Sequence, residues 1–374
     1  MSESWDVVIV GAGIVGAACA LECAKRGMRT AVVEANFIGG GATAAGMGHI
    51  VVMDDSPAQL ALTHYSQTLW QELSKAVPED VEYEACGTLW VAADEEEMQE
   101  VQRKRDVYAS AGVATEILDG PGLADAEPQL RTPLAGALLV RSDAVLYPPC
   151  AAGFLMREAQ RLGVQLYRRK VHSAHSGQIR LDDATQLNSK QIIIASGADA
   201  CELVPGLPIK KRKGHLVITD RYPQFIRHQL VELGYLKSAH SSTTDSVAFN
   251  VQPRKTGQLL IGSSRQYGAE DAEVNPQILS AMTERAQWYL PKIGELSAIR
   301  VWTGFRAATP DKLPLIGPWP EDDSLFLATG HEGLGITTSL GTAQLLVDYF
   351  EGAATAISCE PYLPGRFARS VIRA

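Results

Sequence analysis

Several features that the sequence lacks narrow the range of functions. No run of about 18 apolar residues occurs, so we expect no membrane span. No C-x-x-C pair occurs either, so we expect neither a zinc knuckle nor an iron–sulfur centre, and no other metal, on this chain. The six cysteines are scattered, and the chain opens directly on a strand-like segment rather than a leader. Both features favour a reduced, cytoplasmic protein that would associate with a membrane only through an electron acceptor.

Positive charge is also scarce. The chain has 34 Lys and Arg against 43 Asp and Glu, and its formal net charge of −9 at pH 7 argues against a nucleic-acid partner. One basic cluster, KKRK at residues 210–213, precedes a strand-like run, and we expect it to be solvated. The 374 residues, 46% of them hydrophobic, are typical of an ordinary globular protein of about two domains.

The chain opens with the pattern of a dinucleotide-binding unit. In VVIVGAGIVGAACALECAKRGMRTAVVEA, residues 7–35, an apolar strand, a G-x-G-x-x-G turn, a helix and a second strand follow one another. Gly11 permits the tight turn, Gly13 lets the backbone approach a pyrophosphate, and Gly16 lets the helix pack close to the strand. Glu34 ends the second strand, where a carboxylate can accept hydrogen bonds from ribose hydroxyls. The stretch therefore predicts a bound dinucleotide.

The rest of the chain predicts alternating helices and strands. Residues 39–49 are too rich in glycine and alanine for a packed element, and they suit backbone that runs against a flat ligand. Strand-like runs joined by turns between residues 214 and 262 suggest an antiparallel or mixed sheet. We expect strands over 81–92, 135–140, 165–172, 191–195, 214–219, 230–237, 246–252, 258–262 and 325–328, and helices over 57–74, 94–111, 151–161, 275–290 and 336–350.

Four stretches together resemble the FAD-dependent oxidoreductases of the D-amino-acid oxidase and glycine oxidase superfamily. They are GAGIVG with VVEA, GGGATAAGMGH (39–49), IIIASGADA (192–200), and the C-terminal pair GFRAATPDKLPLIGP (304–318) and ATGHEGLGITTSLGTAQLL (328–346). The last pair is the most specific, because a plain NAD-dependent Rossmann protein has no reason to carry it. Within the superfamily the chain looks most like heteromeric bacterial amine dehydrogenases, which include subunits of opine oxidase, hydrogen cyanide synthase and D-hydroxyproline dehydrogenase.

The resemblance implies an α/β fold with two interleaved domains. An FAD-binding Rossmann-like domain would comprise residues 1–82, 145–208 and 304–374. An inserted substrate domain with a mixed or antiparallel sheet would comprise residues 83–144 and 209–303.

The resemblance also implies the cofactor contacts. The first glycines would hold the FAD pyrophosphate, residues 43–49 would run along the cofactor to the isoalloxazine edge, and the loop 330–337 would reach the pyrimidine side of the flavin. There the N-terminus of the final helix can stabilise negative charge. The implied cofactor-binding residues are Gly11, Gly13, Ile14, Val15, Gly16, Glu34, Ala35, Thr43, Ala44, Ala45, Met47, Gly48, Val171, Ser196, Gly197, Gly330, His331, Gly333, Leu334, Gly335, Ile336 and Thr337.

Arg306 is the residue that we expect to bind the substrate. It lies in TGFRAATPD, where the family keeps an arginine facing the flavin, and a guanidinium can bind a carboxylate through two hydrogen bonds. The implied reaction oxidises a C–N bond to an imine by hydride transfer to flavin N5, which needs orientation more than a strong base. We therefore assign no general base. Two interpretations stay open for His49 and His331: tuning of the flavin or the amine, and a purely structural hydrogen bond.

One strand departs from the family pattern. Glycine-oxidase-like members often place a tyrosine where SVAFNVQPR carries Phe249 and Asn250. The phenolic hydrogen bond to the substrate is therefore in doubt, and we expect Phe249 to pack against an apolar part of the substrate instead. The acidic residue that the family carries after IGS is also absent, with Gln266 nearest to it.

The predicted function is oxidation of a secondary or D-amino acid, best a D-proline such as cis-4-hydroxy-D-proline. The chain would be the catalytic subunit of a heteromeric dehydrogenase whose partner subunits carry an iron–sulfur centre or a further flavin. The FAD would be non-covalent, because LYPPC (146–150) lacks the histidine that tethers a second flavin in sarcosine oxidase, although FMN at a subunit interface stays possible. The alternatives are a stand-alone glycine, sarcosine or D-amino-acid oxidase that releases hydrogen peroxide, an opine oxidase subunit, a subunit that only holds flavin, and an NAD-dependent dehydrogenase.

Overall fold

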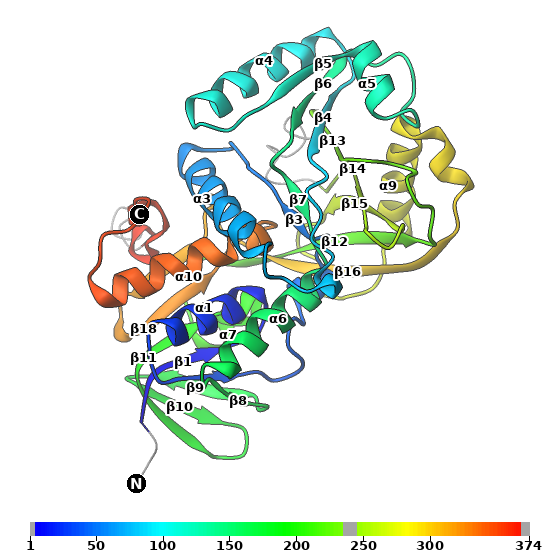
Figure 1. Cartoon of the computed structure of the whole chain (residues 1–374). Helices are drawn as coiled ribbons and strands as arrows, with labels where there is room; N and C mark the ends of the chain where they lie inside the picture. Colours follow the sequence, from blue (N-terminus) through cyan, green and yellow to red (C-terminus); the bar gives the residue numbers. More distant parts are fainter. Residues whose placement is uncertain (1–3, 235–244, 368–374) are drawn as a thin grey trace, which may run out of the picture.

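Two eight-stranded sheets form most of the molecule, with helices packed against them (Figure 1). The computed structural model describes residues 4–234 and 245–367. The first sheet has the strand order β17-β18-β11-β1-β2-β8, with the β9–β10 hairpin joined to β11. Its strands are β1 (Ser4–Val10), β2 (Thr30–Val33), β8 (Gln165–Tyr167), β9 (Val171–His175), β10 (Gln178–Leu181), β11 (Gln186–Ile194), β17 (Leu315–Trp319) and β18 (Asp322–Thr329).

The centre of the first sheet is parallel and buried on both faces. β1 pairs in parallel with β2 and β11, and β11 pairs in parallel with β18. Successive β1 side chains point to opposite faces, so Val7 and Ile9 join one apolar cluster while Val8 and Val10 join another. Helices α1 (Ile14–Lys25), α6 (Pro148–Arg161) and α10 (Gly335–Glu351) cover the first of these faces (Figure 1).

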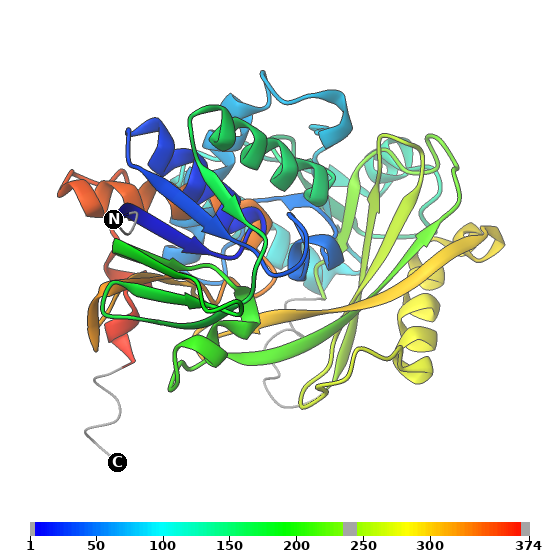
Figure 2. The same cartoon turned by 90° about the horizontal axis from the view of Figure 1, so that it is seen from below.

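The second sheet is mixed and has the strand order β16-β12-β15-β14-β13-β4-β6-β5. Its neighbours are antiparallel except β13 and β4, which run in parallel. Figure 2 shows its two longest strands, β12 and β16, reaching from this sheet towards the first one. The strands are β4 (Thr88–Ala92), β5 (Glu116–Asp119), β6 (Gly136–Val140), β12 (Lys210–Thr219), β13 (Gln229–Glu232), β14 (Ser246–Pro253), β15 (Leu259–Arg265) and β16 (Ala298–Ala308).

Shorter elements connect the two sheets. A two-stranded ribbon of β3 (His49–Ile50) and β7 (Ala144–Val145) lies beside the long helix α3 (Pro57–Leu73). The other helices are α2 (Ala42–Ala45), α4 (Glu95–Ser110), α5 (Gly120–Ala126), α7 (Ala200–Leu203) and α9 (Pro276–Tyr289). Among the residues that the structure describes, no helix is long and apolar enough to cross a membrane. All six cysteines are free thiols in the structure, and two of them, Cys19 and Cys23, are buried.

The α/β fold with a mixed second sheet is confirmed, and three local predictions are wrong. The strand expected over 81–92 begins only at Thr88, because Glu79–Val81 form a 3-10 turn and Glu82 is left-handed, with φ of 51°. The strand expected over 165–172 is two strands, β8 and β9. The strand expected over 230–237 ends at Glu232, and residues 235–237 lie outside the described part.

A fourth error concerns the basic cluster 210–213. These residues are the first part of β12, and Arg212 and Lys213 are buried rather than solvated. Each is paired with a carboxylate: Arg212 with Glu332, and Lys213 with Asp271. The domain boundaries at 82, 144, 208 and 303 stay a prediction, and β16 continues across residue 303.

Candidate active site

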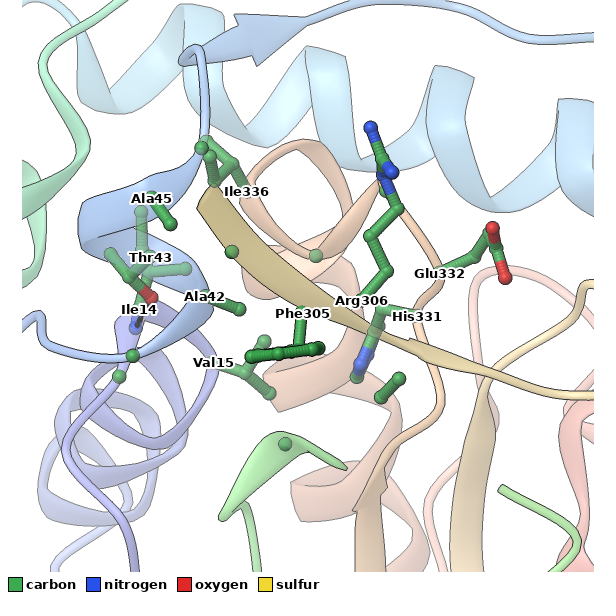
Figure 3. A pocket seen from close by; sticks show the side chains of 18 of the residues that line it. Ile14, Val15, Ala42, Thr43, Ala45, Phe305, Arg306, His331, Glu332 and Ile336 are labelled. Carbon is green, nitrogen blue, oxygen red and sulfur yellow. Dashed lines mark hydrogen bonds between the residues drawn. The ribbon is translucent and has the colours of Figure 1, made fainter. Parts of the chain in front are cut away.

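A large cavity extends between the two sheets. It has a volume of about 680 Å³, and both sheets and the loops between them contribute to its wall. Figure 3 shows its central part, where helix α2 with Ala42 and Thr43, strand β16 with Phe305 and Arg306, and the loop with His331 and Glu332 meet. One end is lined by the first glycine turn and the other by strands of the second sheet.

The glycine turn forms a narrow cradle at one end of the cavity. Gly11 has φ of +105°, and a Cβ there would lie 2.7 Å from the carbonyl oxygen of Ala195. Helix α1 begins directly after Gly13, which has no side chain to cap it. Thr43 accepts a hydrogen bond of 3.0 Å from the Ile14 N–H. The helix N-terminus thus offers N–H groups and the positive end of its dipole to a phosphate.

Glu34 lies at the end of β2, at the rim of this cradle. Its carboxylate accepts hydrogen bonds from the N–H groups of Ala12 (2.7 Å) and Asn36 (2.8 Å). These two bonds fix the carboxylate at the cavity wall and leave acceptor capacity on both oxygens. Beside Gly11, the buried hydroxyl of Ser196 has no hydrogen-bond partner among the described residues. Both groups suit the hydroxyls and phosphates of a dinucleotide.

The loop 330–335 closes the other side of the cavity and leads into α10. Gly330 has φ of 75°, and Glu332 is left-handed, with φ of 55°. His331 is buried, and its Nε2 lies 3.0 Å from the hydroxyl of Thr342. Burial lowers the pKa of His331 to about 4, so the imidazole is neutral at pH 7. Helix α10 then begins at Gly335 with its N-terminus at the cavity.

Arg306 extends into the cavity from β16. Its Nη1 donates a hydrogen bond of 2.9 Å to the carbonyl oxygen of Ser264 on β15. The guanidinium lies over Gly214 of β12, where a Cβ would be only 2.6 Å from Nη1. Phe305 and Arg306 point to opposite sides of the strand (Figure 3). The glycine at 214 therefore makes the space in which the guanidinium lies.

A buried histidine supports the Ser264 segment. His215 Nε2 accepts from the N–H of Asn275, so its Nδ1 carries the proton and donates to the Ser264 hydroxyl, 3.0 Å away. Ser264 Oγ also accepts from the backbone N–H of His215. Burial and the charges of Lys213 and Arg306 lower the pKa of His215. This network fixes the carbonyl that holds Arg306.

Arg212 lies directly opposite Arg306 in the β12–β16 ladder. Arg212 Nη2 donates to Glu332 Oε2 (2.9 Å), and its Nη1 lies 2.5 Å from Oε1. Both side chains are about nine-tenths buried, at 8% and 11% exposure. Burial raises the pKa of Glu332, and the positive charges of Arg212, Arg306, Arg265 and Lys312 oppose that rise.

Three polar side chains form the wall on the side of β13 and β14. His49 Nε2 lies 3.4 Å from Asn250 Nδ2, and Gln229 also interacts with the imidazole. Burial lowers the pKa of His49 to about 4, with a smaller contribution from the charge of Arg306, and the nearby Gln229 side chain opposes the shift. His49 is therefore a neutral imidazole at the cavity wall. Two amide side chains and a neutral histidine therefore line this part of the cavity.

The structure corrects the placement of Phe249. Its side chain is fully buried on the opposite face of β14 and stacks on Tyr289 of α9, with ring centroids 4.3 Å apart. Because neighbouring strand residues point to opposite faces, Asn250 lines the cavity and Phe249 does not. Phe249 therefore supports the core of the second sheet instead of contacting a substrate.

Most of the other predicted site residues line the cavity, together with Arg306 and His49. They are Gly11, Gly13, Ile14, Val15, Glu34, Ala35, Thr43, Ala45, Met47, Gly48, Val171, Ser196, Gly197, Gly330, His331, Gly333, Leu334, Gly335 and Ile336.

Gly16, Ala44 and Thr337 do not line the cavity. A Cβ on Gly16 would lie 2.0 Å from the Gly11 carbonyl oxygen, so this glycine permits close packing of α1 on β1. The Thr337 hydroxyl donates to the His49 carbonyl (2.9 Å) and accepts from the Val51 N–H (3.3 Å). Thr337 therefore holds the backbone of the His49 segment without lining the cavity itself.

The sequence-based prediction missed several residues of the wall, among them Arg212, Glu332, His215 and Gln229. Glu332 lies within the C-terminal motif ATGHEGLGITTSLGTAQLL, so the sequence offered a signal for it. The sequence offered a signal for Arg212 as well, because residues 212 and 214 of one strand point to the same face of the sheet. His215 and Gln229 had none, because only the folded sheet brings them to the cavity.

The cavity fits FAD and offers no metal site. The narrow glycine cradle, the start of α1 after Gly13, the fixed Glu34 carboxylate and the start of α10 at the cavity match the parts of an elongated dinucleotide. Among residues 4–234 and 245–367, no group of three His, Cys, Asp or Glu side chains could hold a metal ion. The fold and the site thus define a flavin-dinucleotide oxidoreductase.

Comparison with known proteins identifies the family. The model of the FAD dependent oxidoreductase family (DAO) matches residues 6–349, and the chain belongs to this family. It is 28% identical to glycine oxidase from Geobacillus kaustophilus, over 97% of this chain and 97% of the relative. It is 27% identical to hydrogen cyanide synthase subunit HcnC from Pseudomonas aeruginosa, over 98% of this chain and 97% of the relative. The crystal structure of L-proline dehydrogenase from P. horikoshii has the same fold, with a TM-score of 0.88, 23% identity, and coverage of 99% of both chains.

Proposed function

We propose that this FAD-dependent oxidoreductase oxidises the C–N bond of an amino acid, with a secondary or D-amino acid such as D-proline or cis-4-hydroxy-D-proline as the preferred substrate. Arg306 carries the proposal. It is an arginine of β16 at the cavity wall, held by the Ser264 carbonyl. A guanidinium in this position suits a carboxylate, which would fix the rest of the substrate in the cavity.

The surrounding residues support binding of the uncharged amine. When bound, FAD supplies the hydride-accepting ring. The neighbouring imidazoles of His49 and His331 have pKa values of about 4 and carry no positive charge at neutral pH. The end of the cavity near Arg306 combines polar Asn250 and Gln229 with the apolar residues Trp90, Val231 and Leu216. Such a wall suits a small ring that carries a polar substituent. The name of one full-length relative, glycine oxidase, also supports a small amino acid as the substrate.

The test is to replace Arg306 and compare substrates that differ in the carboxylate. R306A is expected to lower kcat/KM for D-proline by about a thousandfold, since a charge-assisted pair and its orienting effect are lost together. R306K should recover part of this loss, because it restores the charge without the fork. Prolinamide, which lacks the carboxylate, should be oxidised poorly by the wild type and be insensitive to R306A. Unchanged turnover of D-proline in R306A would refute the proposal.

A second proposal concerns the electron acceptor. The full-length match to a protein named as a subunit favours a catalytic subunit that passes electrons to partner subunits. The equally full-length match to a glycine oxidase favours a stand-alone oxidase. The two differ in one measurement on the purified chain: peroxide production in air against reduction of an artificial dye. Rapid peroxide formation would favour the stand-alone oxidase, and dye reduction without peroxide would favour the subunit.

A further inference from the structure

We propose that Gln229 and Asn250 form a subsite for a hydroxyl group of the amino-acid substrate, and so select a hydroxylated side chain or ring over an unsubstituted one. The inference rests on the proposed function, because it takes an amino acid as the ligand of this cavity. It adds the residues that distinguish one amino acid from another.

The first observation is a row of side chains that crosses three strands of the second sheet. In the ladders of β4, β13 and β14, Val231 lies opposite both Trp90 and Asn250. Partners in a ladder point to the same face of the sheet, and so does Gln229, two residues before Val231. These four side chains, the polar row, all line the cavity. Neighbours of the row along the same strands pack into the apolar core on the opposite face: Leu89, Leu230 and Phe249.

The second observation is that the polar row has hydrogen-bonding capacity that the described residues do not use. The side-chain oxygens of Gln229 and Asn250 are buried, and neither accepts a hydrogen bond from a described residue. Nε1 of Trp90 and Nδ1 of His49 are also buried without such a partner. Gln229 and Trp90 are each only 2% exposed. Buried polar atoms without a partner are costly, so several of them in one cavity wall indicate a polar ligand.

The third observation is that the unused groups are uncharged and of both kinds. The two amide oxygens accept hydrogen bonds, whereas the Trp90 N–H donates one. His49, a neutral imidazole, adjoins both amides: its Nε2 lies 3.4 Å from Asn250 Nδ2, and the Gln229 side chain is close enough to affect its pKa. Because no residue of the row is charged, the row suits neither a carboxylate nor an ammonium group. A hydroxyl suits it, since one oxygen both donates and accepts.

The position of the polar row separates it from the part of the cavity that suits the dinucleotide. The glycine turn and Glu34 follow strands of the first sheet, whereas the row lies on the second. Val231, in the middle of the row, offers an apolar surface beside the two amides. A ligand that combines an apolar ring with one hydroxyl therefore matches the row better than an unsubstituted ring does.

The experiment compares two carboxylates that carry no amine, so neither has a C–N bond to oxidise. They are cyclopentanecarboxylate and cis-3-hydroxycyclopentanecarboxylate, which differ only in the hydroxyl. Isothermal titration calorimetry measures their binding to the FAD-bound enzyme. We expect the wild type to bind the hydroxylated ring about tenfold more tightly, the effect of one or two net hydrogen bonds.

Q229M and N250L remove one amide each and nearly keep the side-chain volume. Each should reduce the preference for the hydroxylated ring from about tenfold to about threefold or less, because one partner of the hydroxyl is lost. The affinity for cyclopentanecarboxylate should stay within about threefold of that of the wild type, since this ring has no group for the amides to bind.

Q191M is the matched control. Gln191, on β11, also has a buried amide oxygen without a hydrogen-bond partner among the described residues, but it does not line the cavity. Q191M should therefore keep the tenfold preference. The ratio of flavin to protein absorbance shows for every variant whether the cofactor is still bound, and either cavity variant is sufficient for the test if the other loses its flavin.

The outcomes separate this inference from the proposed function. If the enzyme oxidises none of D-proline, cis-4-hydroxy-D-proline, glycine and sarcosine, the proposed function fails, and the inference fails with it. If D-proline is oxidised but the wild type binds both rings equally well, the inference alone is overturned. A full preference for the hydroxylated ring in Q229M or N250L, or a loss of that preference in Q191M as well, would also overturn it.

Two further results would assign the amides to another partner and overturn the inference. An equal loss of affinity for both rings in Q229M and N250L would show that the amides bind a part that all substrates share. Loss of bound flavin in both of these variants, with flavin retained in Q191M, would show that the amides contact the cofactor instead.

Discussion

At the scale of single residues, the Arg306 guanidinium has space because residue 214 is a glycine and carries no side chain. Gly214 lies beneath the guanidinium, and a methyl group there would be 2.6 Å from Nη1 and 3.0 Å from the central carbon. The backbone of Gly214 does not have a positive φ, so alanine would not strain the strand. The substitution therefore acts on the position of Arg306 rather than on the fold.

G214A is expected to raise KM for D-proline by about tenfold while kcat falls less, because Arg306 must move before it can bind the carboxylate. Steady-state kinetics with D-proline and with prolinamide measure the effect, and the amide is the control, since it has no group for Arg306 to bind. An equal loss with both compounds would show that the alanine disturbs the cavity in another way.

His331 predicts a specific dependence of stability on pH. Its pKa is about 4 in the folded protein and about 6.5 when unfolded. Between these values the unfolded chain takes up a proton that the folded protein does not, so the contribution of His331 to stability decreases as the pH falls from about 6.5 to 4. The difference in pKa corresponds to about 3 kcal/mol.

H331Q removes this titration, so the wild type should lose stability relative to H331Q on acidification. Urea unfolding of both proteins at saturating FAD, at several pH values from 4 to 7.5, measures the difference. A difference in unfolding free energy that is the same at every pH would contradict the prediction.

At the scale of secondary-structure elements, a buried carboxyl group joins three segments. Asp143, between β6 and β7, accepts hydrogen bonds from the Val52 N–H (3.2 Å) and from Gln67 Nε2 of α3 (2.7 Å). Its second oxygen is buried and makes no hydrogen bond within the described residues. Burial raises the pKa of Asp143 to about 7, well above its ordinary value of 3.8, although hydrogen bonds oppose the shift.

Because the pKa of Asp143 is raised, its contribution to stability changes with pH in the opposite direction to that of His331. The folded protein keeps the proton while the unfolded chain loses it, so the contribution of Asp143 to stability falls as the pH rises from about 4 to 7, by about 4 kcal/mol. D143N retains an acceptor for Val52 and Gln67 and cannot ionise. It should therefore gain stability relative to the wild type over this range, and the same urea series measures it. If D143N instead gained stability relative to the wild type as the pH falls, this would contradict the assignment.

The elements also show what the sequence could and could not predict. β1, α1, β11 and α10 were predictable, because continuous apolar runs, glycine spacing and helical periodicity all indicate the same structure. Residues 210–213 were not, since four consecutive basic residues favour solvent unless buried carboxylates from distant segments pair with two of them. The same limit applies within the site: the motif located Arg306, but Phe249 was assigned to the wrong face of a strand whose register the sequence leaves open.

At the scale of the whole molecule, residues of both sheets line one cavity. The glycine cradle comes from the first sheet, Arg306 and Asn250 come from the second, and the loop 330–335 lies between them. FAD in this cavity would contact parts of both sheets. Bound cofactor is therefore expected to stabilise the molecule as a unit rather than only the domain that carries the glycine turn.

Removing FAD should lower the unfolding temperature, and adding it back at 100 times its Kd should raise the free energy of unfolding by about 2.7 kcal/mol. Circular dichroism follows the sheets and flavin fluorescence follows release of the cofactor. In the FAD-bound protein the two signals should change at one temperature, because loss of the ligand removes its contacts with both sheets together. NAD⁺ at the same concentration is the control and should leave the unfolding temperature of the cofactor-free protein unchanged. Flavin release at a much lower temperature than loss of the circular dichroism signal would show that the cofactor does not hold the two sheets together.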